Sequence, residues 1–237
     1  EDGGVGLLPY ADNDLELSAK LAALSPEQFS QNELRVYFES ILNSPEKTLS
    51  EKILALYGLA GLGDAYLTEL NYFVSNFDLS DEDKLYSALA YGEYGDEAGA
   101  TELLLELSAL EYDELDTEFI ALLATAMETV GSTQSEVLWG LALESEYEND
   151  EFILLEKLLY AEARLARGAQ SDVSFKMNEY KVSLTGNEIY KKSLLPEELA
   201  ALRFSSITGE VLAITQYQIP VDIETVETDE RISISRT

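Results

Sequence analysis

The sequence predicts a mainly α-helical protein, an array of α-helical hairpins followed by a small β-rich segment at the C-terminal end. Three observations predict this fold class. Residues 53–70 and 85–104 are similar helix–turn–helix stretches, in which Gly63-Asp64 corresponds to Gly95-Asp96 at an offset of 32 residues. A repeat of this length indicates hairpins that stack and bury their apolar faces against each other. Apolar residues keep a helical spacing as far as Gly168, and beyond it they alternate with a period of two.

Nine helices are predicted between residues 14 and 167, because capping residues and helix stops recur along this part of the chain. Ser25 precedes Pro26, a favoured first helical residue, and Thr48 with Glu51 forms a capping box. The helices are expected to begin at Asp14, Ser25, Thr48, Asp64, Ser80, Asp96, about Leu115, Thr133, and Asn149 or Asp150. The last of them is expected to end at Arg167, before Gly168.

Small and aromatic residues inside these helices are expected to have packing roles. A glycine in the middle of a helix costs about 1 kcal/mol relative to alanine, so each is predicted to mark a close approach of two helices. These glycines are Gly58, Gly92, Gly99 and Gly140. Trp139 and several tyrosines fit the apolar pattern of their helices and are predicted to lie in the core; these tyrosines are Tyr57, Tyr66, Tyr86 and Tyr91.

The chain is expected to divide into a helical domain, residues 1–168, and a β-rich segment, residues 169–237. In the second part, Asn178-Glu179 lies between two alternating runs, residues 172–177 and 180–184, which is typical of a β-hairpin. A short helical turn is predicted at residues 196–199, with further strands at 201–206, 211–218 and 231–235. A hairpin with so few further strands indicates a partial β-sandwich.

Negative charge is concentrated in the helical part. The chain has 46 acidic and 15 basic residues, a net charge of −31. Residues 1–156 contribute −29 (34 acids, 5 bases), residues 157–237 contribute −2 (12 acids, 10 bases), and no Lys or Arg occurs between Leu85 and Glu156. Such a field repels nucleic acid and anionic membranes. It favours a solvated acidic surface or, as an alternative, a surface that binds a basic partner or cations.

Cysteine and histidine are both absent. The chain therefore lacks a thiolate nucleophile, a Ser-His-Asp triad and any Cys- or His-ligated zinc site. Paired carboxylates are the acid–base chemistry that remains. Pairs at helical spacing, such as Glu93 with Glu97, Asp113 with Asp116, and Glu144 with Glu148, arise by chance among so many acids. The sequence accordingly predicts no catalytic residue, no cofactor-binding residue, no metal ligand and no cofactor.

Several short motifs resemble the α/α-toroid domain of the bacterial alpha-2-macroglobulins and the complement thioester proteins, and more distantly the prenyltransferases and triterpene cyclases. These motifs are Asp2-Gly3-Gly4, residues 55–61 (ALYGLAG), residues 95–97 (GDE) and residues 139–143 (WGLAL), and in the C-terminal part residues 173–184, 209–212, 216–217 and 232–236. The resemblance implies that the hairpins form part or all of a toroid. The family's thioester cysteine has no counterpart here, so the resemblance implies the fold and no catalytic residue.

The predicted function is a non-catalytic scaffold or protein-interaction domain of a larger protein of this type, which is exported or held at a bacterial cell surface. Its expected partners are proteins, including other domains of the same parent chain, with no nucleic acid and no membrane insertion. Two alternatives stay open. One is a carbohydrate-active enzyme on an (α/α) barrel with a carboxylate pair across an aromatic-lined cleft. The other is a tetratricopeptide-like α-solenoid adaptor, which the repeat length allows.

Overall fold

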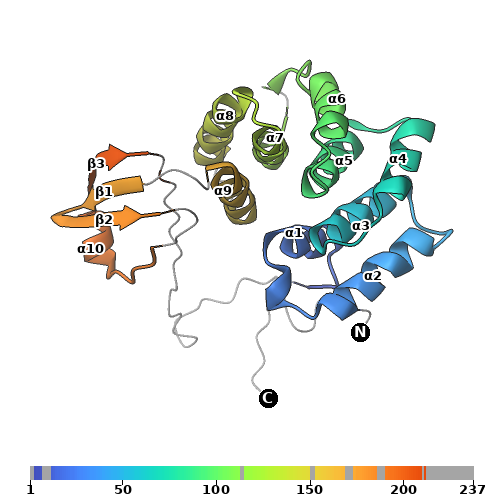
Figure 1. Ribbon diagram of the computed structural model, residues 1–237, viewed down its shortest axis with the longest axis horizontal. Coiled ribbons are helices and arrows are strands. Elements are labelled where there is room, and N and C mark those ends of the chain that lie inside the picture. The colour runs from blue at the N-terminus through green and yellow to red at the C-terminus, as the bar shows by residue number, and fades with distance from the viewer. Residues whose placement is uncertain are drawn as a thin grey trace, which may run out of the picture.

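The computed structural model describes residues 3–6, 12–112, 115–149, 153–168, 173–185, 190–209 and 211 of the 237-residue chain. It is mainly helical, with a small antiparallel sheet in the C-terminal part, as predicted (Figure 1). The helices are α1 (Leu15–Leu24), the 3₁₀ turn η1 (Pro26–Gln28), α2 (Gln31–Asn43), α3 (Leu49–Gly61), α4 (Leu67–Asn76), α5 (Asp81–Glu93), α6 (Glu97–Leu107), α7 (Thr117–Thr129), α8 (Gln134–Asn149), α9 (Leu154–Gly168) and α10 (Pro196–Ala200). The strands are β1 (Val173–Met177), β2 (Tyr180–Leu184) and β3 (Phe204–Thr208).

Helices α1 to α9 form two layers. The odd-numbered helices α1, α3, α5, α7 and α9 each contact the next odd-numbered helix, and α9 also contacts α1, so they form a closed ring. The even-numbered helices pack outside this helical ring, α2 against α3, α6 against α5 and α8 against α7 (Figure 1). Because each even-numbered helix returns the chain, the odd-numbered helices run in the same direction around the ring.

The two repeat hairpins, α3–α4 and α5–α6, owe their likeness to their turns. Gly63 and Gly95 both adopt positive φ angles, +76° and +70°, which L-residues with a Cβ rarely adopt. Beyond each glycine the backbone N–H of an aspartate donates back across the end of the preceding helix, Asp64 to Leu59 O at 3.0 Å and Asp96 to Tyr91 O at 2.9 Å. These bonds satisfy carbonyl groups that the end of a helix otherwise leaves unpaired.

Four of the predicted caps are confirmed. Asp14, Thr48, Ser80 and Asp96 each accept a backbone N–H from the first turn of α1, α3, α5 and α6, and Thr48 and Ser80 complete capping boxes with Glu51 and Asp83. Helix α7, expected to begin at about Leu115, is capped by Asp116.

Two predicted starts are wrong. The Ser25 side chain makes no capping hydrogen bond to the turn η1. Helix α2 begins only at Gln31, because the extended backbone at Phe29 ends that turn. Asp64 does not cap α4, because its Oδ2 accepts from Arg35 Nε at 2.6 Å. Helix α8 begins at Gln134, directly after the predicted cap Thr133. Helix α9 begins at Leu154, later than predicted, and residues 150–152 lie outside the described part.

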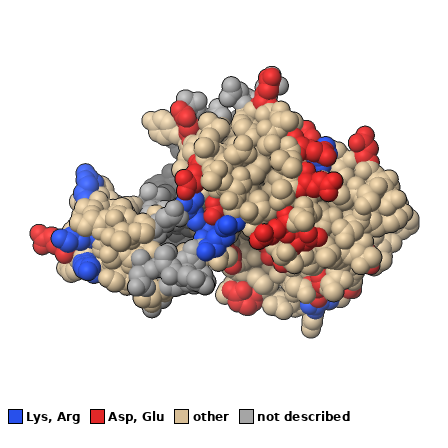
Figure 2. Space-filling view, turned by 45° about the horizontal axis from the view of Figure 1, so that its top comes forward, with Lys and Arg blue, Asp and Glu red and all other residues tan. Residues whose placement is uncertain are grey.

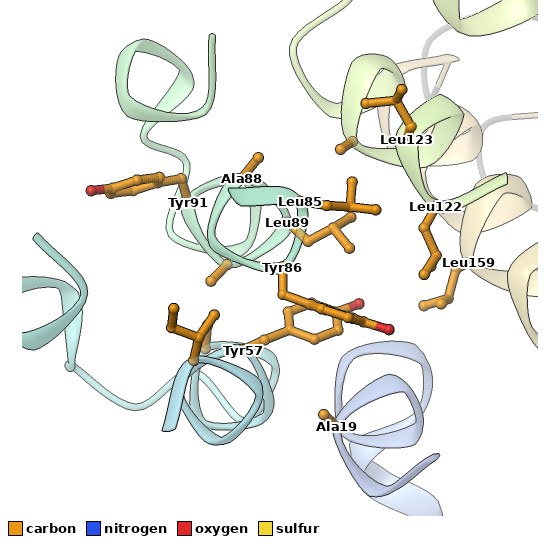
Figure 3. Packing of buried hydrophobic residues seen from close by; sticks show 14 of the residues in the cluster. Ala19, Tyr57, Leu85, Tyr86, Ala88, Leu89, Tyr91, Leu122, Leu123 and Leu159 are labelled. Carbon is orange, nitrogen blue, oxygen red and sulfur yellow. The ribbon is translucent and has the colours of Figure 1, made fainter. Parts of the chain in front are cut away.

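The core fills the inside of the helical ring. Tyr57 and Tyr86 lie at its centre with rings 5.8 Å apart, surrounded by apolar side chains of α1, α5, α7 and α9 (Figure 3). Tyr91 is also buried, whereas Tyr66 and Trp139 are partly buried against the same core, and Trp139 stacks on Tyr160 at 4.1 Å. The predicted core positions of the aromatic residues are therefore confirmed, in part for Tyr66 and Trp139.

Three of the four mid-helix glycines mark close helix approaches, as predicted. A Cβ at Gly58 would meet the Phe38 ring at 2.4 Å, one at Gly92 would meet Thr129 Oγ1 at 2.9 Å, and one at Gly99 would meet the Tyr91 ring at 3.0 Å. The prediction is wrong for Gly140, where a Cβ meets nothing within 4 Å.

The small sheet has its own core. Its strand order is β2-β1-β3, and both pairs are antiparallel. Phe175, Met177 and Val182 form a buried cluster separate from that of the helices. The hairpin turn at Asn178 and the short helix α10 are confirmed, whereas the third strand begins at Phe204 rather than at residue 201. The predicted strand at 231–235 and all but Val211 of that at 211–218 lie outside the described residues.

Candidate functional site

Acidic side chains gather where the odd-numbered helices begin. Glu16, Glu82, Glu118 and Glu156 occupy the first turns of α1, α5, α7 and α9. A carboxylate in a first turn is stabilised by the positive end of the helix dipole. Because these helices run in the same direction, their acidic first turns meet at one mouth of the helical ring.

Lys20 lies at the centre of this mouth, and its side chain is only 4% exposed. Its Nζ is 2.7 Å from Glu16 Oε1 and 2.9 Å from Glu156 Oε1, and it also donates to Glu118 Oε1. The hydroxyl of Tyr86 donates to Glu16 from the other side. This Lys20 cluster (Lys20, Glu16, Glu118, Glu156 and Tyr86) joins α1, α5, α7 and α9, and it helps to close the ring between α1 and α9.

The protonation states in the Lys20 cluster differ from one carboxyl group to the next. Burial alone would lower the pKa of Lys20, but the charge of Glu156 and bonds to the carboxylates raise it above its usual value. Burial raises the pKa of Glu118 to about 7, where Glu16 adds to the effect and Lys20 opposes it. In contrast, bonds from Lys20 and Tyr86 outweigh burial and lower the pKa of Glu16. Lys20 is therefore a permanent ammonium beside one ionised carboxylate and one that exchanges a proton near neutral pH.

This arrangement contains a feature of acid–base catalysis, since carboxyl groups with divergent pKa values can act as acid and base. Among the described residues, the space around these carboxyl groups is filled. Lys20 occupies the space between the carboxylates, and Tyr57 and Tyr86 fill the ring beneath them (Figure 3). In the described part of the chain, two shallow pockets of about 260 Å³ each lie elsewhere, one beside the α7–α8 turn and one on the small sheet.

Another carboxyl group with a raised pKa lies at the opposite end of the ring. Glu93 is the last residue of α5, and although its side chain reaches solvent, desolvation by the surrounding protein raises its pKa to about 7. The charge of Glu162 on α9 contributes as well. The carboxylate that helps to raise the pKa of Glu93 is thus Glu162, across the ring, and not Glu97, with which the sequence pairs Glu93.

The pocket beside the α7–α8 turn is lined by two cations and two anions. Arg164 pairs with Glu136 at 2.6 Å and lies 3.6 Å from Glu128, while Arg167 Nη1 donates to the backbone oxygen of Glu128 at 3.2 Å. The Arg167 guanidinium lies so close to Gly131 that a Cβ there would meet its Nη2 at 1.9 Å. These contacts fix α9 to the end of α7, which is a structural role.

Among the described residues, no group of three or more acidic side chains is arranged to hold a metal ion. The Lys20 ammonium lies where the carboxylates of the ring mouth converge. Every described helix is too short or too polar to cross a lipid bilayer. The predicted pair Asp113–Asp116 cannot be placed, because Asp113 lies outside the described residues, as does the side chain of Glu148.

The sequence predicted no site, and it missed the Lys20 cluster. One local signal exists: Glu16 and Lys20 are four residues apart on one helix, a spacing that favours an ion pair. Glu118 and Glu156 are 98 and 136 residues away from Lys20, and no local pattern links them to it. Compared with known proteins, the chain matches no family model, no curated protein and no solved structure.

Proposed function

We propose that the helical ring is a non-catalytic scaffold, a protein-interaction domain of a larger exported or cell-surface protein of the alpha-2-macroglobulin-like type. The observation that carries this proposal is the filled centre of the ring. Tyr57 is 1% exposed and Tyr86 3%, and the buried Lys20 closes one mouth with ion pairs to three carboxylates. A ring packed in this way offers its outer surface to partners and no interior to a substrate.

The closed ring also bears on the alternative of a tetratricopeptide-like adaptor. In such solenoids each repeat contacts only its neighbours along the array. Here the first odd-numbered helix, α1, contacts the last, α9, and Lys20 and Glu156 join them through a bond of 2.9 Å. The contact favours a compact scaffold over an open superhelix.

The enzymatic alternative gives the proposal its test. The purified protein is incubated with a panel of polysaccharides and aryl glycosides between pH 5 and 8, and released sugar is measured. We expect no turnover from the wild type or from Glu118→Gln, which changes the carboxyl group best suited to act as an acid. Turnover by the wild type that Glu118→Gln abolishes would refute the scaffold.

A positive test uses the domains that adjoin this chain in its parent protein. Expressed separately, they should bind the helical ring in trans, as measured by isothermal titration calorimetry. The absence of binding to any adjoining domain, together with sugar release, would favour the enzyme.

A further inference from the structure

Helix α8 carries apolar residues on both of its faces. On the inner face Leu138 and Ala142 are buried against the core. On the outer face Val137, Leu143 and Tyr147 are 65%, 40% and 89% exposed. An outer helix is expected to bury one apolar stripe and to present polar residues to water. The outer face of α8 therefore has the composition of a surface that packs against another element.

Gly140 lies in the middle of this outer face. At the other mid-helix glycines, Gly58, Gly92 and Gly99, an added Cβ would lie 3.0 Å or less from a neighbouring side chain, so packing inside the protein accounts for them. At Gly140 a Cβ would meet nothing within 4 Å. Glycine at this position lowers helix stability by about 1 kcal/mol relative to alanine. What glycine provides in return is a shallow spot where a second backbone can approach closely.

The shape of this surface fits a helix. At 3.6 residues per turn, Val137, Gly140, Leu143 and Tyr147 fall within an arc of about 120° over nearly three turns. Larger side chains at either end with glycine between them form a groove for the ridge of a partner helix.

The charges around the groove indicate the chemistry of that helix. Glu136 and Glu144 lie on the same face as these apolar residues and are exposed. Glu136 already pairs with Arg164 of α9 at 2.6 Å, so Glu144 is the acid that indicates the partner's charge. No Lys or Arg occurs in the sequence between Leu85 and Glu156. Figure 2 shows acidic side chains spread over the helical part with a few Lys and Arg side chains among them, and further Lys and Arg side chains over the small sheet. A second copy of this face would bring its acidic side chains against those of the first, which is destabilising, whereas Lys and Arg of another partner would be attracted to Glu144.

We propose that the outer face of α8 binds an amphipathic helix of a partner protein, in which Lys and Arg flank an apolar stripe. The inference rests on the proposed scaffold function, and it assigns that function's partner surface to Val137, Gly140, Leu143 and Tyr147. The partner's stripe packs over Gly140, and its basic residues face Glu144.

The test uses two synthetic helical peptides of about 18 residues with the same Leu/Ala stripe, one flanked by Lys and the other by Glu, with binding to the full chain measured by fluorescence anisotropy. We expect the Lys peptide to bind at least tenfold more tightly than the Glu peptide. Gly140→Leu, which fills the groove, and Tyr147→Ser should each weaken binding of the Lys peptide at least tenfold. The matched control is Leu105→Ser on α6, where Leu105 is 68% exposed; its binding should equal that of the wild type.

Four results would overturn the inference. Equal binding of the two peptides would remove the role of charge, and binding that Gly140→Leu leaves intact would place the contact elsewhere. Self-association in sedimentation that Tyr147→Ser abolishes would make a second copy the occupant. Binding of adjoining domains that survives Gly140→Leu would sink this inference and leave the scaffold function standing, so the two failures can be told apart.

Discussion

At the scale of single residues, Lys20 has the largest effect on how the helices are held together. An ammonium group loses its hydration when it is buried, and this loss is offset only when good partners replace the water. Lys20 has three carboxylate partners, one from its own helix and two from α7 and α9. The ion pairs thereby convert a residue that should destabilise the core into a contact that fixes the position of three helices.

Replacing Lys20 by methionine should lower the free energy of unfolding by about 3–5 kcal/mol at pH 7.5, because the carboxylates around it lose their counter-ion. Adding Glu156→Leu should recover part of this loss, since Glu156 is the most buried of the three acids. Urea denaturation measures both. Lys47→Met is the control: its pair with Glu51 is exposed and should contribute less than about 1 kcal/mol. Equal losses for Lys20→Met and Lys47→Met would contradict this account.

Glu93 and Glu118 should make stability depend on pH. Their pKa values rise from 4.5 to about 7 on folding, so between these values the folded protein binds more protons than the unfolded chain. The free energy of unfolding should therefore fall as pH rises from 4.5 to 7. Urea denaturation at pH 5, 6, 7 and 8 should show this decline.

The control for this pH dependence is a change of equal charge elsewhere. The double variant Glu93→Gln/Glu118→Gln should have a flatter dependence, while Glu97→Gln/Glu102→Gln, which removes two exposed carboxylates of α6, should keep the slope of the wild type. The same slope in all three proteins would mean that overall charge repulsion, and not these two groups, sets the pH dependence.

At the scale of elements, the helix ends are determined locally and the helix contacts are not. Thr48 with Glu51 and Ser80 with Asp83 form capping boxes at α3 and α5, and Gly63 and Gly95 supply the positive φ at which α3 and α5 give way to α4 and α6. Each of these features involves residues within a few positions of one another. Asp64 was predicted to cap α4, but its side chain pairs with the distant Arg35 and makes no cap.

A glycine-to-alanine substitution at two positions separates the effect of local helix propensity from the effect of contacts between distant residues. Gly58→Ala should destabilise the protein by about 1–3 kcal/mol, because its Cβ would meet the buried Phe38 ring at 2.4 Å. Gly140→Ala should instead stabilise it by about 0.5–1 kcal/mol, because only helix propensity changes there. Thermal denaturation followed by circular dichroism reports both. A loss of stability in Gly140→Ala would show that Gly140 is already in contact within the chain.

At the scale of the whole molecule, the described residues form two separate hydrophobic clusters. One joins side chains from α1 to α9, and the other joins β1, β2 and Val211. The charge is divided in the same way, since the helices hold nearly all of the net negative charge. Separate cores indicate parts that can fold independently.

A chain ending at Gly168 should therefore fold without the β-rich segment. We expect this fragment to unfold cooperatively in urea, with the same midpoint as the helical transition of the full chain. Far-UV circular dichroism measures both transitions. A fragment that loses its helical signal, or that unfolds at a much lower urea concentration, would show that the sheet supports the helices.

How far prediction from sequence succeeds depends on the range of the interaction. The nine helices, the repeat, the hairpin at Asn178 and the core tyrosines were predicted because spacing, caps and turns record them within short windows. The start of α2 was not, because the extended backbone of Phe29 interrupts the helix. The candidate site was missed because its members come from helices up to 136 residues apart.

The sequence by itself determined an array of helical hairpins with an acidic surface and a small sheet after Gly168, because helix periodicity, capping and charge are properties of neighbouring residues. Tertiary structure alone decided that the odd-numbered helices close into a ring, and that Lys20 meets Glu118 and Glu156 at its mouth. It also decided that Gly140 faces open space while Gly58 is covered by Phe38. Contacts between distant residues depend on how the helices pack, and no short stretch of sequence records that packing.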